Sequence, residues 1–333
     1  MFRAMPTYSL PPAQEAEILT QIVNEVEQAL GQSISNYGSV GNGQNPTYPL
    51  FVDGKTHPSY LLKIPKRKGY PSVPTLQVCY DLLQQKGLGD YRIVYHSAES
   101  KVVPYGFFVQ PWLVGQASDP DVGDNEDPSW LADFIVILRQ VHSIQMHGFG
   151  YLTEGPQYAS LQDYFFHMDE VVDHSFGQVL EAGASIWDLD KQGITSPDFL
   201  EKTFATVCEQ AQRIQNPVTP VLLHGDMLPG NLLHTAQGPM LFDWDESRAG
   251  WWVYEIARTL YYLPFDKLLT FFLDHYDTGG FSYDEIKTGI RLEHIRQNLR
   301  YVCICTFNVT DREAARIEVR KYEKKIQSIL ELE

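Results

Sequence analysis

The sequence predicts an α+β protein with two parts, a small part built on β-strands and a larger, mostly helical part. Short apolar runs separated by Gly, Pro and Asp-Gly turns fill the N-terminal third of the chain, which is typical of strands. Beyond Trp130, apolar residues recur at helical spacing over long segments. The length of 333 residues also suggests about two domains. We therefore expect a boundary at Gln110.

The first part is expected to begin with a helix over residues 12–30, which has one apolar face and ends at Gly31. A strand, a glycine-containing loop and two further strands follow, and Asp53-Gly54 forms the turn between the last two. A helix is expected over residues 74–86. The five predicted strands, which together form one sheet, are residues 33–40, 47–51, 60–64, 91–95 and 103–110.

The second part is expected to be helical around one small β-region. Val221–Leu223 reads as a short strand. Leu232-Leu233 and residues 240–242 read as the arms of a hairpin whose turn is residues 235–238. The predicted helices are residues 130–147, 161–181, 198–215, 284–300 and 311–331.

Composition excludes several classes of function. The formal net charge of −16 disfavours nucleic acid and anionic membranes as partners, and it is compatible with a cationic substrate. The ten histidines form no zinc motif, and no apolar run approaches the length of a membrane span. The four cysteines form no CxxC pair, and the N-terminus lacks a signal-peptide pattern, so we expect a cytoplasmic protein.

Residues 221–245, VLLHGDMLPGNLLHTAQGPMLFDWD, carry the chemistry. They place His224, Asp226, Asn231 and Asp243 around one short loop and its hairpin. Such a set suits phosphoryl transfer, because one carboxylate can face a hydroxyl while an amide and a second carboxylate hold metal ions against ATP phosphates. The alternative is that Asp226 and Asn231 only cap turns.

The paired segments HGDMLPGN and LFDWD resemble the catalytic motif and the metal-binding Asp of the aminoglycoside phosphotransferase and choline kinase family. The resemblance runs from about residue 33 to about residue 264. It implies a protein-kinase-like fold with two lobes, which uses ATP and Mg²⁺ to phosphorylate small molecules. The implied N-terminal lobe, residues 1–110, binds the nucleotide and contains the helix 12–30, the glycine loop 38–45 and the strand lysine Lys63. The implied C-terminal lobe, residues 111–333, is helical and contains the catalytic loop 224–231 and the metal-binding segment 242–245.

The resemblance also implies roles for individual residues. Asp226 is the catalytic residue that accepts or orients the proton of the attacking hydroxyl. His224 belongs to the same catalytic loop and shapes it through hydrogen bonds. Asn231 and Asp243 hold magnesium, which prefers oxygen ligands. Asp245 lies near enough in sequence to reach the metal or the substrate.

The nucleotide is expected to contact the first lobe. In the segment GNGQNPTY, Gly41, Gly43 and Asn45 would cover the phosphates, although Gly-Asn-Gly is also an ordinary hairpin turn. Lys63 matches the strand lysine that pairs with the α and β phosphates. The segment FFVQPWLVG would hold adenine through backbone groups near Gln110 and Trp112, unless Trp112 is simply a core residue.

Two positions depart from the family pattern. The expected Glu of the helix over residues 74–86 is replaced by Gln77, with Asp81 as the only acid of that helix. Glu255 stands where the family has an Asp that holds the catalytic loop. These departures leave room for a nucleotide-binding pseudokinase or scaffold, against which the intact Asp226, Asn231 and Asp243 argue.

The leading hypothesis is an ATP-dependent phosphotransferase that acts on a hydroxyl of a small, cationic acceptor, such as an amino sugar or an amino alcohol. A protein kinase is a weaker alternative, because only about a dozen positions separate Asp243 from the next helix and no APE-like segment is present. No motif in the sequence indicates the identity of the acceptor or the oligomeric state. The acids expected to attract a cation are Asp163, Asp169, Glu170 and Asp173.

Overall fold

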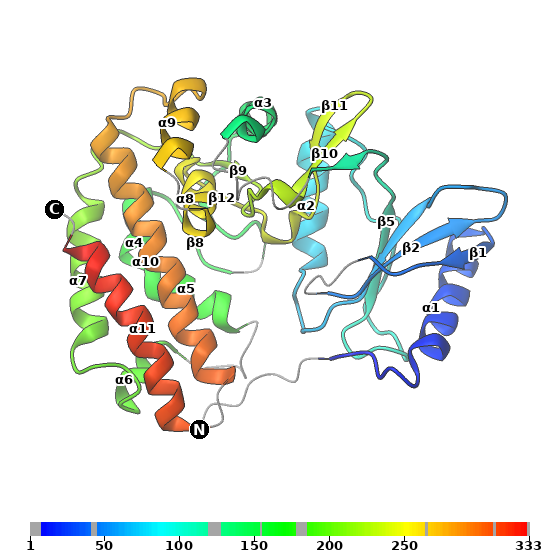
Figure 1. Cartoon of the computed structure of the whole chain (residues 1–333), viewed down its shortest axis with the longest axis horizontal. Coiled ribbons are helices and arrows are strands. Elements are labelled where there is room, and N and C mark those ends of the chain that lie inside the picture. Colours follow the sequence, from blue (N-terminus) through cyan, green and yellow to red (C-terminus); the bar gives the residue numbers. More distant parts are fainter. Residues whose placement is uncertain are drawn as a thin grey trace. The chain divides into compact units, whose positions relative to one another are not determined.

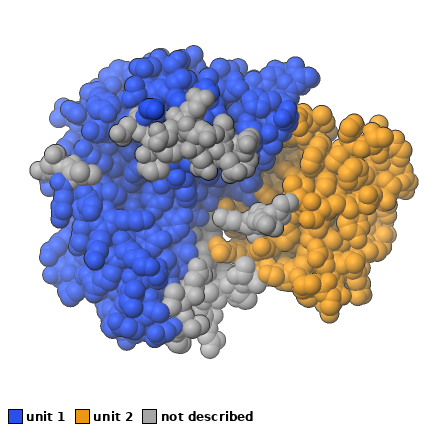
Figure 2. Space-filling model, viewed as in Figure 1, with its two compact units in different colours: residues 1–4, 116–333 blue, residues 5–115 orange. Residues whose placement is uncertain are grey.

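The computed structural model describes residues 8–40, 45–118, 128–153, 155–177, 185–263, 266–308 and 311–331. The chain forms two compact units, residues 5–115 and residues 116–333 together with residues 1–4 (Figure 2). The structural division thus falls after Gly115, slightly beyond the boundary expected from the sequence. Each unit has its own sheet or sheets and its own helices.

The unit of residues 5–115 is built on one five-stranded antiparallel sheet, as predicted, in the order β1-β2-β3-β5-β4 (Figure 1). The register of β2, β3 and β5 is regular, with Thr47 opposite Lys63 and Lys63 opposite Phe108, whereas the pairing of β1 with β2 shifts between Ile34 and Asn36. The strands are β1 (Ile34–Tyr37), β2 (Thr47–Val52), β3 (Tyr60–Lys63), β4 (Tyr95–Ser97) and β5 (Phe107–Pro111).

Helix α1 (Glu15–Leu30) covers this sheet through its apolar face. Ile22 and Val26 are fully buried and share one core with Leu50 and Leu62 of the sheet. Gly31 ends the helix in the left-handed conformation with a positive φ, which explains why a glycine follows the last apolar turn. The core of the unit is therefore the apolar side of α1 packed on the inner face of β2, β3 and β5.

The fourth strand begins later than expected. The sequence predicts a strand over residues 91–95, but only Tyr95–Ser97 forms one. The ring of Tyr91 stacks on Tyr80 of α2 (Val73–Gln85), and the Tyr91 carbonyl accepts a hydrogen bond of 2.6 Å from Gln84. Contacts with α2 therefore take the place of sheet pairing at this residue.

The unit of residues 116–333 is mostly helical, and α10 packs against α11, α8, α5 and α7 (Figure 1). Its helices are α3 (Leu131–Val141), α4 (Leu161–Phe166), α5 (Met168–Gly177), α6 (Trp187–Lys191), α7 (Phe199–Ala211), α8 (Val253–Tyr262), α9 (Asp266–His275), α10 (Tyr283–Asn308) and α11 (Arg312–Leu330).

Three predicted helices end at least four residues earlier than expected, and the one over residues 198–215 ends at Ala211. The helix over residues 130–147 ends at Val141, because Ile144 and Met146 pair through their backbones with Leu222 and Pro220. The helix over residues 161–181 breaks at His167, whose ring stacks on Tyr158 with the planes 5° apart. Long-range contacts end these last two helices where local periodicity would continue them.

Two small antiparallel sheets carry the motif residues. One has the order β8-β7-β12-β9, and the other has the order β11-β10-β6. The hairpin of β10 and β11 agrees with the prediction, including its turn at residues 235–238. The strands are β6 (Gln116–Ala117), β7 (Phe149–Gly150), β8 (Gln157–Tyr158), β9 (Val221–Leu223), β10 (Leu232–Thr235), β11 (Gly238–Leu241) and β12 (Arg248–Gly250).

Among the described residues, no helix combines the length and the apolar character needed to cross a membrane.

Candidate active site

The catalytic loop 224–231 leaves the end of β9, which pairs with β12 so that Leu223 lies opposite Arg248. Gly225 follows with a positive φ, a conformation that side chains disfavour. A Cβ added at Gly225 would lie 2.2 Å from the backbone oxygen of Glu246. The glycine of the HGD motif is therefore required by a close approach of two backbone segments.

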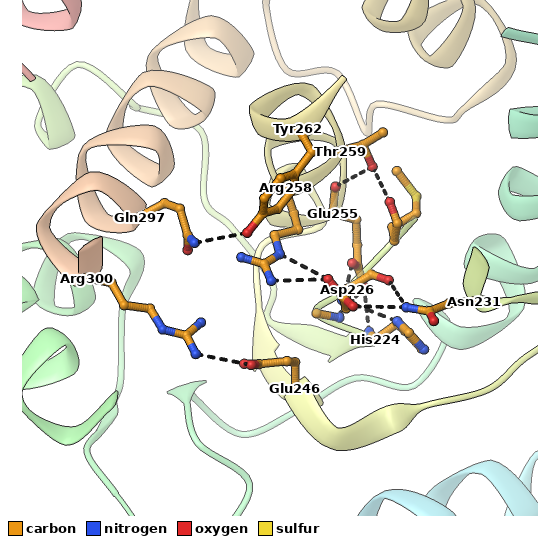
Figure 3. A network of polar contacts seen from close by, with 12 residues as sticks. His224, Asp226, Asn231, Glu246, Glu255, Arg258, Thr259, Tyr262, Gln297 and Arg300 are labelled. Atoms are coloured by element: carbon orange, nitrogen blue, oxygen red, sulfur yellow. Dashed lines mark hydrogen bonds and ion pairs between the residues drawn. The ribbon is translucent and has the colours of Figure 1, made fainter. Parts of the chain in front are cut away.

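Glu246 is itself held in place on the other side of this contact. Its carboxylate accepts a bond of 3.3 Å from Arg300 of α10 and lies 4.0 Å from Nη2 of Arg248 (Figure 3). The backbone segment at Glu246, which lies against Gly225, is therefore held by helix α10.

Glu255 of α8 holds the first two residues of the loop, as predicted for the family's Asp position. Its fully buried carboxylate accepts the backbone N–H of His224 at 2.5 Å and that of Gly225 at 3.2 Å. Burial alone would raise the pKa of Glu255, but the imidazole of His142, whose Nε2 lies 4.0 Å away, the neighbouring imidazole of His224 and the Gly225 N–H together lower it below its ordinary value. The carboxylate is thus held in its charged form.

His224 shapes the loop rather than facing solvent. Its side chain is fully buried, with Nε2 2.9 Å from the carbonyl of Phe242 and Nδ1 3.3 Å from the backbone N–H of Asp226. The N–H can only donate, so Nδ1 accepts and Nε2 carries the proton donated to Phe242. The imidazole therefore ties the catalytic loop to the segment that leads into Asp243.

Asp226 has both carboxylate oxygens engaged (Figure 3). Oδ2 accepts from Nδ2 of Asn231 at 3.0 Å, and Oδ1 accepts from Nε of Arg258 at 3.2 Å. Its side chain is 23% exposed, so a substrate hydroxyl can reach it. Sequence reasoning missed Arg258, although its position three residues after Glu255 on the same helix puts both on neighbouring faces.

Asn231 and Asp243 are brought together by the β10–β11 hairpin. Leu232 pairs with Leu241, and the N–H of Phe242 bonds to the carbonyl of Asn231 at 3.1 Å, so Asp243 emerges beside Asn231. Asp243 is exposed and has a positive φ, which is rare for a residue other than glycine and is often found at functional sites.

The chemistry of this pair suits a magnesium ion. Because the Asn231 amide nitrogen donates to Asp226, the amide oxygen could bind a cation, and the Asp243 carboxylate could supply a second ligand. Magnesium bound to ATP takes only one or two protein ligands, with phosphates and waters completing the shell. Within the described residues no group of three or more His, Cys, Asp or Glu side chains is placed to hold a metal ion.

The residues expected to contact nucleotide lie in the other unit. Lys63 ends β3 and is 9% exposed, in register with its neighbours on β2 and β5. Asn45 is 6% exposed, and its side-chain oxygen accepts the N–H of Lys66 at 3.0 Å, so it tethers two backbone segments. Gly41 and Gly43 lie outside the described residues. Gln77, the candidate partner of Lys63, is exposed and donates to Asp81 at 2.9 Å.

Several backbone groups of the expected adenine-binding segment are already used, because Phe107–Pro111 pairs with β3 and β4. The N–H of Trp112 donates to the carbonyl of Ser59 at 3.0 Å, and the side chain of Gln110 accepts from Tyr80 at 3.0 Å. A purine held here would have to bond to other backbone groups of the segment. Trp112 is half-buried and so is not a core residue.

The acids expected to attract a cation already have partners inside the helical unit. Asp163 accepts from Ser160 at 2.7 Å and Asp169 from Trp187 at 2.9 Å. Glu170 accepts from Tyr158 at 2.9 Å. Asp173 accepts from Ser185, and burial raises its pKa despite that bond. The contacts of these carboxylates therefore serve the packing of α4, α5 and α6.

The sequence matches the phosphotransferase enzyme family, APH, over residues 41–287. A search of curated protein sequences gave no match.

Solved structures with a similar fold include three kinases. One is aminoglycoside phosphotransferase APH(4)-Ia, with a TM-score of 0.62 and 13% identity over 95% of this chain and 98% of that chain. Choline kinase LicA from Streptococcus pneumoniae has a TM-score of 0.60 and 16% identity over 93% of this chain and 99% of that chain. A putative fructosamine-3-kinase from Thermobifida fusca has a TM-score of 0.60 and 14% identity over 90% of this chain and 98% of that chain.

The shared architecture is the protein-kinase-like fold of these enzymes, with an antiparallel sheet in the first part and helices in the second. The family match spans most of the chain and includes the whole loop from His224 to Asp243. The chain therefore belongs to the phosphotransferase enzyme family, as a small-molecule kinase.

Proposed function

We propose that this kinase transfers the γ-phosphate of ATP to a hydroxyl of a small molecule, with Asp226 as the residue that faces the hydroxyl. The observation that carries the proposal is the clamped, partly exposed carboxylate of Asp226 beside the Asn231–Asp243 pair. Related structures support the nucleotide, since APH(4)-Ia was solved with ADP and with AMP-PNP together with hygromycin B.

In the proposed reaction, the acceptor oxygen forms a bond to the γ-phosphorus as the bond to the β,γ-bridging oxygen breaks, and ADP leaves. The proton of the hydroxyl passes to Asp226, which also orients the oxygen for attack. Asn231 and Asp243 hold magnesium, which neutralises charge on the phosphates when it is bound. His224 and Glu255 keep the loop in the geometry that this transfer needs.

Lys63 is proposed to pair with the α and β phosphates, and the segment from Gln110 to Trp112 to border the adenine. Gly41, Gly43 and Asn45 are proposed to frame the phosphates. For Asn45 this role would be indirect, because its side chain holds the backbone of Lys66. The proposed function needs ATP and magnesium.

The acceptor is proposed to be a small compound with a free hydroxyl, and its cationic character stays a prediction. The net charge of −16 favours a cation at long range, whereas Asp163, Asp169, Glu170 and Asp173 are occupied by internal hydrogen bonds. A cationic acceptor should show a Michaelis constant that rises with ionic strength. A cytoplasmic location belongs to the same proposal, and all four cysteines are free thiols.

The test is release of ADP from Mg-ATP against a panel of amino sugars, amino alcohols and neutral sugars. Asp226→Asn should lower kcat by about 10²–10⁴-fold, the worth of a general base, while Mg-ATP still stabilises the protein against heat. Glu209→Gln, which removes the charge of an exposed side chain that pairs with Arg213, serves as the control. Single-turnover rates of Asp226→Asn within tenfold of wild type would overturn the assignment.

The alternative of a pseudokinase or scaffold has no support from the family match or from the related structures. The panel separates the two directly, because a pseudokinase would bind nucleotide without releasing ADP above the rate of Asp226→Asn.

A further inference from the structure

Arg258 is the residue of the site that the sequence analysis did not assign. It lies on α8, its side chain is 11% exposed, and its guanidinium faces Asp226 (Figure 3). Nε and Nη2 each lie 3.2 Å from Oδ1 of Asp226. Two nitrogens of one planar group thus converge on a single carboxylate oxygen.

Burial explains why this contact is maintained. A buried guanidinium is costly unless an ionised carboxylate lies beside it. Among the described residues, Asp226 is the carboxylate that forms an ion pair with Arg258. Removing either partner would leave the other charge poorly compensated, so the two side chains hold each other.

The guanidinium is also held from its other side. Its carbon lies 4.8 Å from the centroid of the Tyr262 ring, one helical turn further along α8, in a cation–π arrangement. The Tyr262 hydroxyl in turn accepts from Gln297 of α10 at 3.4 Å and lies 3.0 Å from the hydroxyl of Tyr301. Helix α10 therefore supports Tyr262, which supports Arg258.

Asp226 is consequently clamped between two donors from different elements. Asn231 of the loop holds Oδ2, and Arg258 of α8 holds Oδ1. If only Asn231 remained, the carboxylate could rotate about its side-chain bonds. Phosphoryl transfer depends on positioning, and a displacement of about 1 Å can cost roughly 100-fold in rate.

We propose that Arg258 is a positioning residue for phosphoryl transfer, which fixes the Asp226 carboxylate in the orientation that receives the acceptor hydroxyl. This inference rests on the proposed function of Asp226. It assigns to α8 two separate tasks, with Glu255 holding the backbone of the loop and Arg258 holding its catalytic side chain.

The test compares Arg258→Met with a matched variant, Arg296→Met. Arg296 is also buried, also pairs with a carboxylate (Glu293, 2.6 Å) and also stacks on a tyrosine ring (Tyr254, 4.9 Å), but it does not contact Asp226. Arg258→Met should lower kcat by about 100-fold with the Michaelis constant for ATP within threefold, because geometry at Asp226 is lost. Arg296→Met should lose stability with kcat within about threefold.

Chemical rescue of kcat distinguishes a positioning role of Arg258 from a purely structural one. Guanidinium ion at millimolar concentration should restore kcat of Arg258→Ala at least tenfold and leave Arg296→Ala unchanged. Arg258→Lys, which keeps the charge but not the two-nitrogen contact, should fall between wild type and Arg258→Met. Parallel losses of kcat in Arg258→Met and Arg296→Met, or no rescue, would overturn the proposal.

A second measurement does not depend on turnover. The Nε–H resonance of Arg258, identified by its loss in Arg258→Lys, should move in Asp226→Asn and stay in place in Glu293→Gln. An unmoved resonance in Asp226→Asn would refute the contact itself. If wild type released no ADP with any acceptor, the proposed function would have failed, and this resonance would still decide the role of Arg258 in holding Asp226.

Discussion

Replacing Glu255 by Gln tests the physical basis of the catalytic loop. The carboxylate accepts two backbone N–H groups in a fully buried position, from His224 at 2.5 Å and from Gly225 at 3.2 Å. Gln keeps the shape but offers one acceptor oxygen and an NH₂ group that cannot accept. Both N–H groups reach Oε1, and that of Gly225 also lies 3.2 Å from Oε2, so the NH₂ group of Gln would place a donor against the Gly225 N–H and the remaining bonds would lose the carboxylate charge.

The structure sets the size of the effect. A hydrogen bond to a charged group contributes about 1.5–3 kcal/mol and one between neutral groups about 0.5–1.5 kcal/mol, so the loss of charge at two bonds should cost about 2–3 kcal/mol. For a domain of about 200 residues this corresponds to a fall in Tm of roughly 4–12 °C. Displacement of the loop should lower kcat by about 100-fold.

The assay is thermal unfolding together with ADP release, and Glu323→Gln is the control. Glu323 is also buried, and it also holds a loop, because it accepts the backbone N–H of Ser196 at 2.6 Å and its hydroxyl at 2.8 Å. Its variant should lose stability to a similar extent with kcat within threefold. A Tm of Glu255→Gln indistinguishable from that of wild type, together with kcat within threefold, would refute the reasoning.

The pH dependence of stability gives an independent check on Glu255. Its pKa in the folded protein lies below the ordinary 4.5, so its stabilising effect is fully present above pH 4.5 and is lost as the pH falls through the folded value. The difference in Tm between wild type and Glu255→Gln should therefore shrink below pH 4.5. A difference in Tm between the two proteins that grows as the pH falls would contradict this prediction.

Three further predictions address the metal, the nucleotide and acid stability. Asp243→Ala should remove most of the stabilisation that Mg-ATP confers on the protein. For a ligand at 100 times its Kd this stabilisation is about 2.7 kcal/mol. Equal thermal shifts for wild type and Asp243→Ala would show that Asp243 holds no metal. Lys63→Ala should raise the Michaelis constant for ATP more than Gln77→Ala, because Gln77 is exposed and bonded to Asp81; the reverse order would place Gln77 at the phosphates. Hydrogen bonds from Asn216, Ser282 and Gln215 outweigh the effect of burial and lower the pKa of Glu285 to about 2. The wild-type protein should therefore lose stability relative to Glu285→Gln as the pH falls from 4.5 to 2. Equal pH profiles of Tm for the two proteins would contradict this prediction.

The sequence by itself determined the elements whose signals are local. Apolar periodicity and turn residues were enough for the five-stranded sheet, the β10–β11 hairpin and the presence of most long helices. The spacing of His224, Asp226, Asn231 and Asp243 was enough to propose the loop as the catalytic one, because these residues lie within twenty positions of one another. Family resemblance then implied the kinase-like fold, which the related structures confirm.

Tertiary structure alone decided where elements stop and which side chains support the loop. Val141 ends its helix because the following residues pair with β9, and His167 breaks its helix where its ring meets Tyr158. Arg258 became part of the site only when α8 was placed beside Asp226, 32 positions earlier in the chain. Periodicity reports the faces of a single element, whereas a hydrogen bond between distant residues depends on how two elements are packed, and no local pattern encodes that distance.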